Sequence, residues 1–181
     1  MGYYVFVDNS NVWIEGKYAS AVKKKMAGNI VEAHTKKISD NSWKIDFGNL
    51  LLCAVDGNLS EVKEAIIVGS KPTQKDSLWQ AMTSAGFTVE TQQRNSSNRE
   101  KKIDTGIVQK INKKLYREAE DGDIFVLVLG DSDYVPTVES IEEDGKKVKI
   151  VFWDNVAGEL VASASEYKCL NDYIDDIEFK K

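Results

Sequence analysis

The chain has 181 residues, of which 42% are hydrophobic and 29% charged, and its formal net charge is −5. This length and balance predict one domain with its own core, and they exclude collagen-like, low-complexity and largely disordered chains. No apolar run approaches the roughly 18 residues of a membrane helix, and the start MGYYVFVDNSN lacks a basic segment followed by an apolar one. We therefore expect a cytoplasmic protein with no membrane partner.

The cysteine and histidine content limits the metal chemistry that the chain can support. Cys53 and Cys169 lie far apart in apolar surroundings, without a second cysteine or histidine at metal-ligand spacing, so we expect buried, reduced thiols. The single histidine, His34, together with these isolated cysteines excludes a zinc site of ordinary composition.

Residues 3–8, YYVFVD, form a short apolar run that meets the polar residues NSN. This pattern predicts a strand buried on both faces of a parallel sheet, with Asp8 at its carboxyl end. The residues that follow have helical propensity in parts but no sustained amphipathic period. We interpret residues 16–42 as a lysine-rich insertion, part helix and part loop, in a single domain that spans residues 1–181.

Helix and strand signals alternate over the rest of the chain. Apolar residues at helical spacing, with glycine or proline at the ends, predict helices over 45–57, 74–86, 103–116, 134–145 and 155–165. Apolar or alternating runs predict strands within 61–70, 87–94, 123–129 and 146–153, with 167–171 as an edge strand. This alternation predicts an α/β fold whose parallel sheet carries helices on both faces.

Three aspartates follow the predicted strands. Asp8 ends the first strand, and Asp131 and Asp133 follow the apolar run VLVLG. Ligands of such sheets bind beyond the carboxyl ends of the strands, so these carboxylates should converge. With an effective dielectric constant of about 20, two like charges about 4 Å apart repel by about 4 kcal/mol. A divalent cation would offset this repulsion, and carboxylates are ligands that Mg²⁺ prefers.

A fourth acid, Asp104, occurs in KKIDTGI. We place it in the first turn of a helix that begins near Lys101 or Lys102, where the helix dipole favours an anion. By itself this position is typical of a helix-capping aspartate. First-turn residues in such folds also face the strand ends, so Asp104 can join the other three acids. The polar residues expected around the same crevice are Asn9, Asn11 and Ser132.

Basic residues are concentrated in two segments despite the negative total. Residues 94–117 carry eight lysines and arginines against Glu100 and Asp104, and residues 17–44 carry seven lysines against two acids. The C-terminal part of the chain is acid-rich. Each basic segment is equally compatible with a solvated face and with a surface that contacts nucleic acid.

The segments FVDNSNV, KKIDTGI and VLGDSDYVPTVESIEEDGKKVKIVFW resemble the NYN domain, a LabA-like branch of the PIN-like nuclease superfamily. The resemblance spans nearly the whole chain apart from residues 16–42. It implies a three-layer α/β/α sandwich with a mainly parallel sheet in the strand order 3-2-1-4-5. It also implies a metal-dependent ribonuclease activity, and it makes plausible a homodimer that joins two crevices into one basic channel.

The resemblance also implies roles for individual residues. The catalytic, metal-binding acids would be Asp8, Asp104, Asp131 and Asp133, which would hold Mg²⁺ or Mn²⁺, with Asn11 and Ser132 in support. Lys101 would face phosphate. Many PIN nucleases present one more acid near the start of an early helix. The candidates for this further acid are Glu15 and Asp46, so the number of bound metal ions, one or two, is left open.

One or two such ions can activate a water molecule and neutralise the leaving oxygen of a phosphodiester. We expect endonucleolytic cleavage of RNA, single-stranded or structured, with the RNA backbone bound by Arg99, Lys101 and Lys102. Trp13 and Tyr134 flank the two central motifs and could stack on bases, although burial is the default for aromatic residues.

Two other functions stay open. The first alternative to a nuclease is a non-catalytic PIN-like module that binds RNA and has a regulatory role. GDSD after an apolar strand is also similar to haloacid-dehalogenase-like phosphatases, but those need an aspartate where this chain has Ser10. No Gly-x-Gly-x-x-Gly or Gly-Lys-Ser/Thr motif follows a strand, which excludes dinucleotide-binding and P-loop functions. Phosphate contacts do not by themselves distinguish RNA from DNA.

Overall fold

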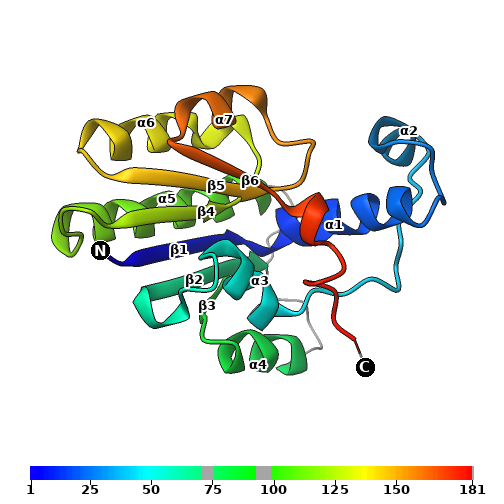
Figure 1. Cartoon of the computed structure of the whole chain (residues 1–181), viewed down its shortest axis with the longest axis horizontal. Helices are drawn as coiled ribbons and strands as arrows, with labels where there is room; N and C mark the ends of the chain where they lie inside the picture. The colour runs from blue at the N-terminus through cyan, green and yellow to red at the C-terminus, as the bar shows by residue number, and fades with distance from the viewer. Residues whose placement is uncertain (71–75, 93–98, 181) are drawn as a thin grey trace.

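The computed structural model describes residues 1–70, 76–92 and 99–180, with the side chains of residues 70, 76, 92 and 99–104 left outside the description. Within these ranges one sheet of six parallel strands has the order β3-β2-β1-β4-β5-β6 (Figure 1). The strands are β1 (Tyr3–Asp8), β2 (Val62–Ser70), β3 (Thr88–Gln92), β4 (Ile124–Val128), β5 (Lys147–Phe152) and β6 (Glu166–Cys169). The expected α/β fold and strand order are confirmed, and β6 extends the order at the edge beside β5.

Helices cover both faces of this sheet. Figure 1 shows α3 in front of the strands and α5 behind them, and α5 packs against β1 and β2 while α6 packs against β5. The α-helices are α1 (Asn9–Lys23), α2 (Ile30–Thr35), α3 (Phe47–Ala54), α4 (Asp76–Ser84), α5 (Arg99–Arg117), α6 (Val135–Glu143) and α7 (Gly158–Ser163). The described ranges also contain the short 3-10 helices η1 (Leu59–Glu61), η2 (Ser132–Tyr134) and η3 (Leu170–Tyr173). In the part of the chain that the structure describes, no helix is long and apolar enough to cross a bilayer.

The two central strands are apolar because both of their faces are covered. Every residue of β1 is buried, and so are the last four residues of β4. The rings of Tyr4 and Phe6 stack on Phe125 across the two strands, with centroid distances of 5.4 and 6.2 Å. All six strands run parallel, so their carboxyl ends meet at one edge of the sheet, to which β1 points in Figure 1.

Helix α1 begins directly after β1 and continues beyond the edge of the sheet (Figure 1). The indole Nε1–H of Trp153 donates a hydrogen bond to the carbonyl oxygen of Val12 (2.9 Å). At Gly16, a β-carbon would lie 2.4 Å from the ring of Trp43, so the helix can approach this ring only with glycine there. These contacts hold α1 against the end of β5.

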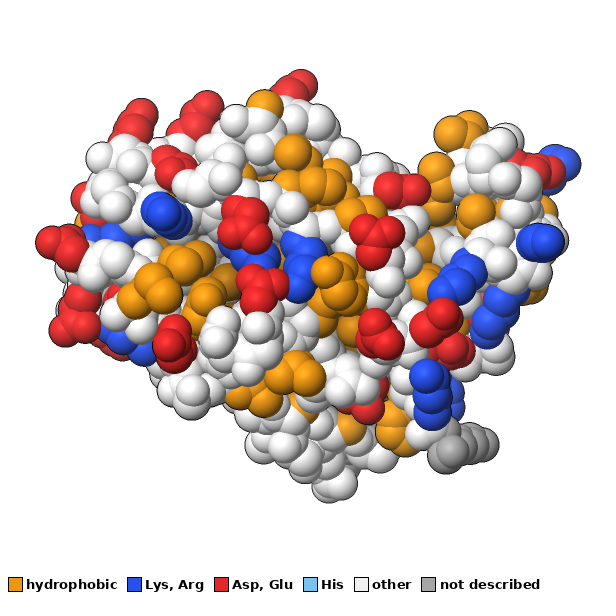
Figure 2. Space-filling view, viewed as in Figure 1, with side chains coloured by type: hydrophobic (Ala, Val, Ile, Leu, Met, Phe, Trp, Pro, Cys, Tyr) orange, Lys and Arg blue, Asp and Glu red, His pale blue; other side chains and the backbone are white. Residues whose placement is uncertain are grey.

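Residues 16–42 contain the end of α1, helix α2 and the loops around it, which we call the arm. Figure 2 shows lysine side chains gathered over α1 and α2, with acidic side chains beside them. Lys23 pairs with Asp175, and Lys24 pairs with Asp40 (2.6 Å) and Glu178 (3.4 Å). The acid-rich C-terminal segment therefore folds back onto the lysine-rich arm and neutralises part of its charge.

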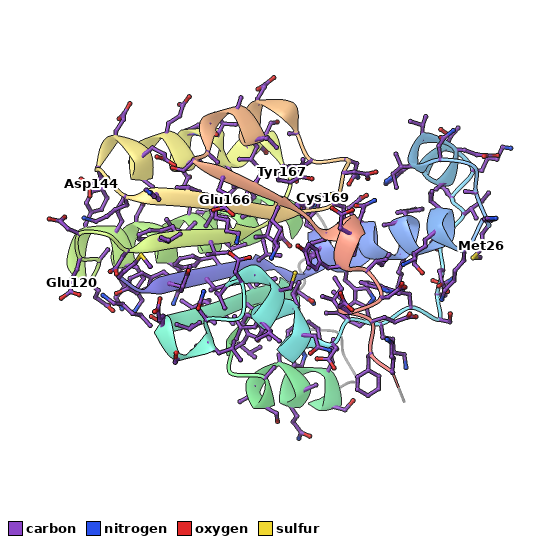
Figure 3. The ribbon with its side chains drawn as sticks, viewed as in Figure 1. Met26, Glu120, Asp144, Glu166, Tyr167 and Cys169 are labelled. Carbon is purple, nitrogen blue, oxygen red and sulfur yellow. The ribbon has the colours of Figure 1, made fainter. Side chains whose placement is uncertain are left out.

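At the opposite edge of the sheet, marked by Glu120 and Asp144 in Figure 3, a buried carboxylate joins three strands. The side chain of Asp123 accepts hydrogen bonds from Gly2 N–H (2.8 Å), Glu120 N–H (2.9 Å) and Lys63 Nζ (2.8 Å). Burial raises the pKa of this carboxyl group, but the hydrogen bonds from Lys63 and the backbone outweigh it, so its pKa lies below the ordinary value.

We expect Asp123→Asn to lower the free energy of unfolding by about 1–3 kcal/mol, because an amide cannot accept all three hydrogen bonds. The folded pKa is depressed, so the contribution of Asp123 is complete above the unfolded pKa of about 3.9 and is lost as the pH falls through the folded value. Urea unfolding should show the wild type and the variant converging below a pH of about 4.

The matched control for this experiment is Asp144→Asn, which changes an exposed carboxylate at the same edge of the sheet (Figure 3) that makes no ion pair within the described residues. It should leave the unfolding curve unchanged at every pH. A deficit in Asp123→Asn that stays constant into strong acid would contradict the assigned role of its charge.

Candidate functional site

The register of the central strands places two of the predicted acids near one another in the sheet. Val7 of β1 pairs with Val128 of β4, so Asp8 is one residue beyond this pair and Asp131 is three residues beyond it. Neighbouring strands lie about 4.8 Å apart. The carboxyl ends of β1 and β4 therefore bring Asp8 and Asp131 to the same edge of the sheet.

Asp8 is both the last residue of β1 and the N-cap of α1. It is only 5% exposed, and its Oδ1 accepts a hydrogen bond from the backbone N–H of Asn11 (3.1 Å). This bond satisfies one of the free N–H groups at the start of the helix and fixes the orientation of the carboxylate. Its second oxygen does not take part in this cap.

Asn11 links the two strand ends. Its side-chain Oδ1 accepts a hydrogen bond from the backbone N–H of Gly130 (3.0 Å), which is 119 residues away in the chain. Gly130 is the residue before Asp131. Two hydrogen bonds and one peptide bond thus connect Asp8 to Asp131 through Asn11 and Gly130. These bonds hold the two acids in a common framework.

Gly130 is at a position where any side chain would collide with a neighbouring ring. A β-carbon there would lie 2.2 Å from two ring carbons of Phe152, which is itself buried. The carbonyl oxygen of Gly130 also accepts a hydrogen bond from Ala157 N–H (3.0 Å). These two contacts fix the backbone of the turn after β4, and this turn sets the position of Asp131.

The residues after this turn divide into exposed and buried positions. Asp131, Ser132 and Asp133 are exposed, and Ser132 begins η2. Tyr134 is only 1% exposed, so its ring is part of the core and is not a stacking surface for bases. Helices α5, α6 and α7 all pack against η2.

Asn9 is the next polar residue of this edge. It is 7% exposed, and its Oδ1 has no hydrogen-bond partner among the described residues. It packs beside Gly69, where a β-carbon would lie 3.4 Å from the Asn9 side chain and 3.0 Å from the ring of Trp79. A buried oxygen without a partner is costly, so this atom is available to a ligand group.

Asp104 lies on α5, which packs against β1, β2 and η2. The helix begins at Arg99, earlier than predicted, so Asp104 is its sixth residue and belongs to the second turn. The predicted place of Asp104 in the first turn, where the helix dipole acts most strongly, is therefore corrected to the second turn. The side-chain roles predicted for Arg99, Lys101, Lys102 and Asp104 fall outside the described residues.

Among the side chains that the structure describes, no three histidine, cysteine, aspartate or glutamate residues lie close enough together to hold an ion. The carboxylate of Asp104 is not among the side chains searched. The oxygens of Asp8, Asp131, Asp133 and Asn9 are the donors that this edge offers, and such oxygen ligands suit Mg²⁺ or Mn²⁺.

The two candidates for a further acid both have structural roles. Glu15 Oε2 lies 2.8 Å from His34 Nε2 and accepts a hydrogen bond from Asn155, so it joins α1 to α2 and to the loop after β5. Asp46 caps α3 by accepting a hydrogen bond from Asn49 N–H (2.9 Å). These hydrogen bonds give both carboxylates a structural role, so neither supports a role as a further metal ligand.

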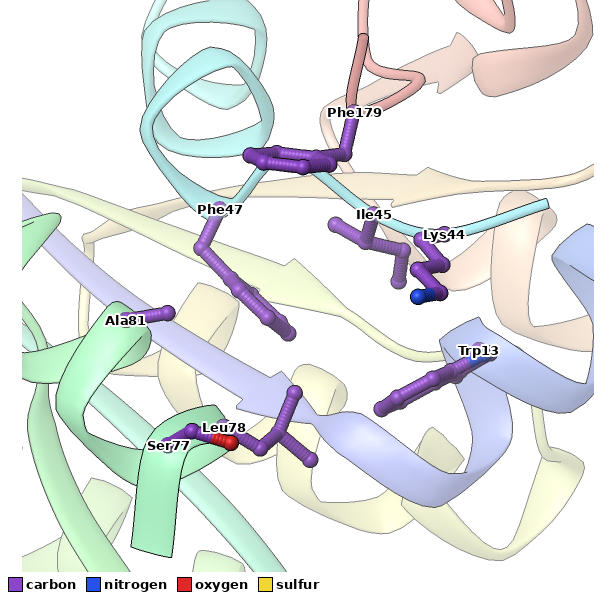
Figure 4. Close-up of a pocket in the computed structure, with 8 residues that line it drawn as sticks. All are labelled: Trp13, Lys44, Ile45, Phe47, Ser77, Leu78, Ala81 and Phe179. Carbon is purple, nitrogen blue, oxygen red and sulfur yellow. The ribbon is translucent and has the colours of Figure 1, made fainter. Parts of the chain in front are cut away.

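A pocket of about 300 Å³ lies at the same edge of the sheet, on the side of β2 (Figure 4). Among the residues that line it, sequence reasoning proposed only Trp13 for contact with a ligand. The lining residues are mostly apolar, with Lys44 and Ser77 as the polar members, and they share no motif. They come from four separate parts of the chain, and the complete set is Trp13, Lys44, Ile45, Phe47, Ser77, Leu78, Ala81 and Phe179.

Comparison with solved structures supports the fold. A protein of unknown function from Vibrio parahaemolyticus has a crystal structure similar to this one, with a TM-score of 0.68 and 18% sequence identity, covering 98% of this chain and 96% of that chain. A comparison with curated proteins finds no match. The family model of the NYN domain matches residues 3–171. The chain therefore belongs to the NYN domain family, which is a family of PIN-like nucleases.

Proposed function

We propose that the protein is a divalent-metal-dependent ribonuclease that hydrolyses RNA phosphodiester bonds endonucleolytically, in the cytoplasm. Membership of a PIN-like nuclease family supports the reaction class. The observation that carries the proposal is the hydrogen-bonded link through Asn11, which holds the acid-bearing ends of β1 and β4 together. The two cysteines are free, which suits a reducing compartment.

The residues of this edge fit Mg²⁺ or Mn²⁺. Asp8 is oriented by its cap, Asp131 and Asp133 are exposed, and the buried Oδ1 of Asn9 lacks a partner in the described protein. In the proposal the four aspartates hold the ion, with Asn9, Asn11 and Ser132 as supporting groups. When bound, the ion supplies an activated water molecule and charge neutralisation at the leaving oxygen.

The chain itself contributes orientation and substrate binding. The cap on Asp8 and the fixed turn at Gly130 preorganise two carboxylates, so less reorganisation is needed when charge develops on the phosphate. We assign binding of the RNA backbone to Arg99, Lys101 and Lys102 at the start of α5. Binding at this helix should weaken as the salt concentration rises, because phosphate contacts release counterions.

Removal of divalent ions tests this function directly. We expect the protein to cut a circular single-stranded RNA in Mn²⁺ or Mg²⁺, to stop in EDTA, and to recover when excess Mn²⁺ is added. A circular substrate has no ends, so its linearisation measures endonucleolytic cleavage alone. Cutting that continues in EDTA would contradict the proposed chemistry.

The second candidate is a non-catalytic RNA-binding module, and the absence of a described three-residue metal cluster favours it. Salt-dependent RNA binding without cleavage in any divalent ion would establish this alternative. As part of the nuclease proposal, two copies of the chain form a homodimer that joins two such edges. Sedimentation of the protein with and without RNA measures its oligomeric state.

A further inference from the structure

We propose that the pocket beside the acidic edge, which we call the aromatic pocket, binds one unpaired nucleobase of the substrate strand. The inference rests on the proposed function, because it names the part of the RNA that this same edge recognises. It makes the protein selective for RNA whose bases are free to leave a helix.

The aromatic pocket lies close to the candidate acids. Trp13 follows Asp8 by five residues on α1, an advance of about 7 Å along the helix axis. On its other wall, Leu78 adjoins Trp79, whose ring lies against Gly69 beside Asn9. A strand whose phosphate meets Asp8 can therefore place a nearby base in the pocket.

The lining of the pocket suits a flat aromatic ligand. Figure 4 shows Trp13, Phe47 and Leu78 converging from α1, α3 and α4, with Ile45 and Phe179 above them. Bases stack on aromatic side chains without regard to sequence. A volume of about 300 Å³ is at the small end of ligand pockets, which limits the occupant to a group of about the size of one base.

The charge at the rim favours a nucleotide over an apolar peptide side chain. Lys44 is exposed at the pocket and makes no ion pair within the described part of the chain, whereas Lys23 and Lys24 on the arm are paired with acids. Lys17 lies 5.7 Å from the ring centroid of Trp13. Two cations beside aromatic rings complement a ligand that joins a base to phosphate.

The pocket is open to solvent and is not a gap in the core. Phe179 is 52% exposed, and Ser77 and Ala81 are exposed at its rim. Phe179 is held there because its N–H donates a hydrogen bond to the carbonyl oxygen of Lys44 (2.8 Å). A base inside a duplex cannot enter such a pocket without unstacking, so paired RNA should be disfavoured.

Binding measured in EDTA separates this inference from cleavage. The probe is a uridine oligonucleotide of about ten residues, compared with an abasic oligonucleotide of the same length and charge. Trp13 is the one tryptophan that lines the pocket, while Trp43, Trp79 and Trp153 are buried. We expect the uridine strand to quench tryptophan emission and to bind more tightly than the abasic strand.

Variants identify the pocket as the cause. Trp13→Ala should weaken binding of the uridine strand by about 5- to 150-fold and leave binding of the abasic strand unchanged, while Trp13→Phe, which keeps a stacking ring, should retain most of the affinity. Phe179→Ala should weaken binding of the same strand and carries less risk to folding, because this side chain is half exposed. The matched control is Tyr116→Ala, which removes an exposed aromatic ring near the C-terminal end of α5.

The outcomes distinguish the two proposals. Equal binding of the uridine and abasic strands by the wild type, or unchanged binding by both Trp13→Ala and Phe179→Ala, would overturn the base pocket even if the protein cleaves RNA. Base-dependent binding that Trp13→Ala abolishes, in a protein that cuts RNA in no divalent ion, would support the pocket and reject the nuclease.

Discussion

Replacing Asp131 by asparagine is expected to reduce metal-dependent RNA cleavage by on the order of a hundredfold to a thousandfold, without loss of stability. A metal ion stabilises transition-state charge by several kcal/mol, and each 1.36 kcal/mol changes the rate about tenfold. Asparagine has nearly the same shape as aspartate but carries no charge. The variant therefore keeps the turn after Gly130 and loses the attraction for the cation.

The stability of this variant gives an independent readout. Asp8 and Asp131 follow neighbouring strands, so removal of one charge relieves repulsion in the metal-free protein. In EDTA, the thermal midpoint of Asp131→Asn should equal or exceed that of the wild type. Added Mn²⁺ should raise the midpoint of the wild type more than that of the variant, because only the wild type keeps the full set of ligands.

Two companion variants complete this experiment. Asp8→Asn should lose activity to a similar degree, and it should remain folded because asparagine is also a good N-cap for α1. Asp144→Asn makes the same chemical change at the opposite edge of the sheet (Figure 3) and should retain full activity. Undiminished cleavage by Asp131→Asn would show that the activity arises elsewhere.

The second large effect is expected from Gly130→Ala. The added methyl group would lie 2.2 Å from ring carbons of Phe152, and this ring is buried, so either the ring or the turn must move. Overpacking of this kind costs about 1–3 kcal/mol. For a chain of this size, each kcal/mol lowers the thermal midpoint by about 2–4 °C. We therefore expect a lower midpoint in calorimetry.

Movement of the turn would also disturb the candidate site. The N–H of Gly130 donates to Asn11, and the next residue is Asp131, so the folded variant should also cleave more slowly than the wild type. Gly158→Ala is the matched control, because a β-carbon at Gly158, the first residue of α7, meets nothing within 4 Å. It should be neutral or slightly stabilising, since alanine favours helices.

A double-mutant cycle assigns the cause. In a Phe152→Leu background, Gly130→Ala should cost less stability than in the wild type, because the smaller side chain leaves space for the methyl group. An equal cost in both backgrounds would mean that the ring of Phe152 is not what requires glycine at this position.

Sequence reasoning succeeded where burial imposes a pattern and failed where it does not. The apolar runs of β1 and β4 are fully or almost fully buried, and the acids that follow them could be placed at strand ends from this pattern alone. The start of α5 was predicted too late because the apolar period begins only at Ile103. The polar first turn from Arg99 carries no such signal, so Asp104 was assigned to the wrong turn.

Helix α1 shows the same limit from another side. Its sequence has no sustained amphipathic period, yet it forms a helix of 15 residues. Its buried positions are Asn9, Val12, Gly16, Ala19, Ser20 and Ala21, a mixture of polar, small and apolar residues. Helix α1 packs against Trp43, Trp153, α2 and β2, and this environment comes from other segments of the chain.

The amino-acid sequence alone determined the α/β alternation, the central position of β1 and β4, and the placement of Asp8 and Asp131 at strand ends, because these follow from local apolar runs and the polar residues that end them. Only the tertiary structure decided the link between Asn11 and Gly130, the pairing of the arm lysines with C-terminal acids, and the assembly of the aromatic pocket. Each of these joins residues from distant segments, and local patterns carry no information about contacts formed only when the whole chain packs.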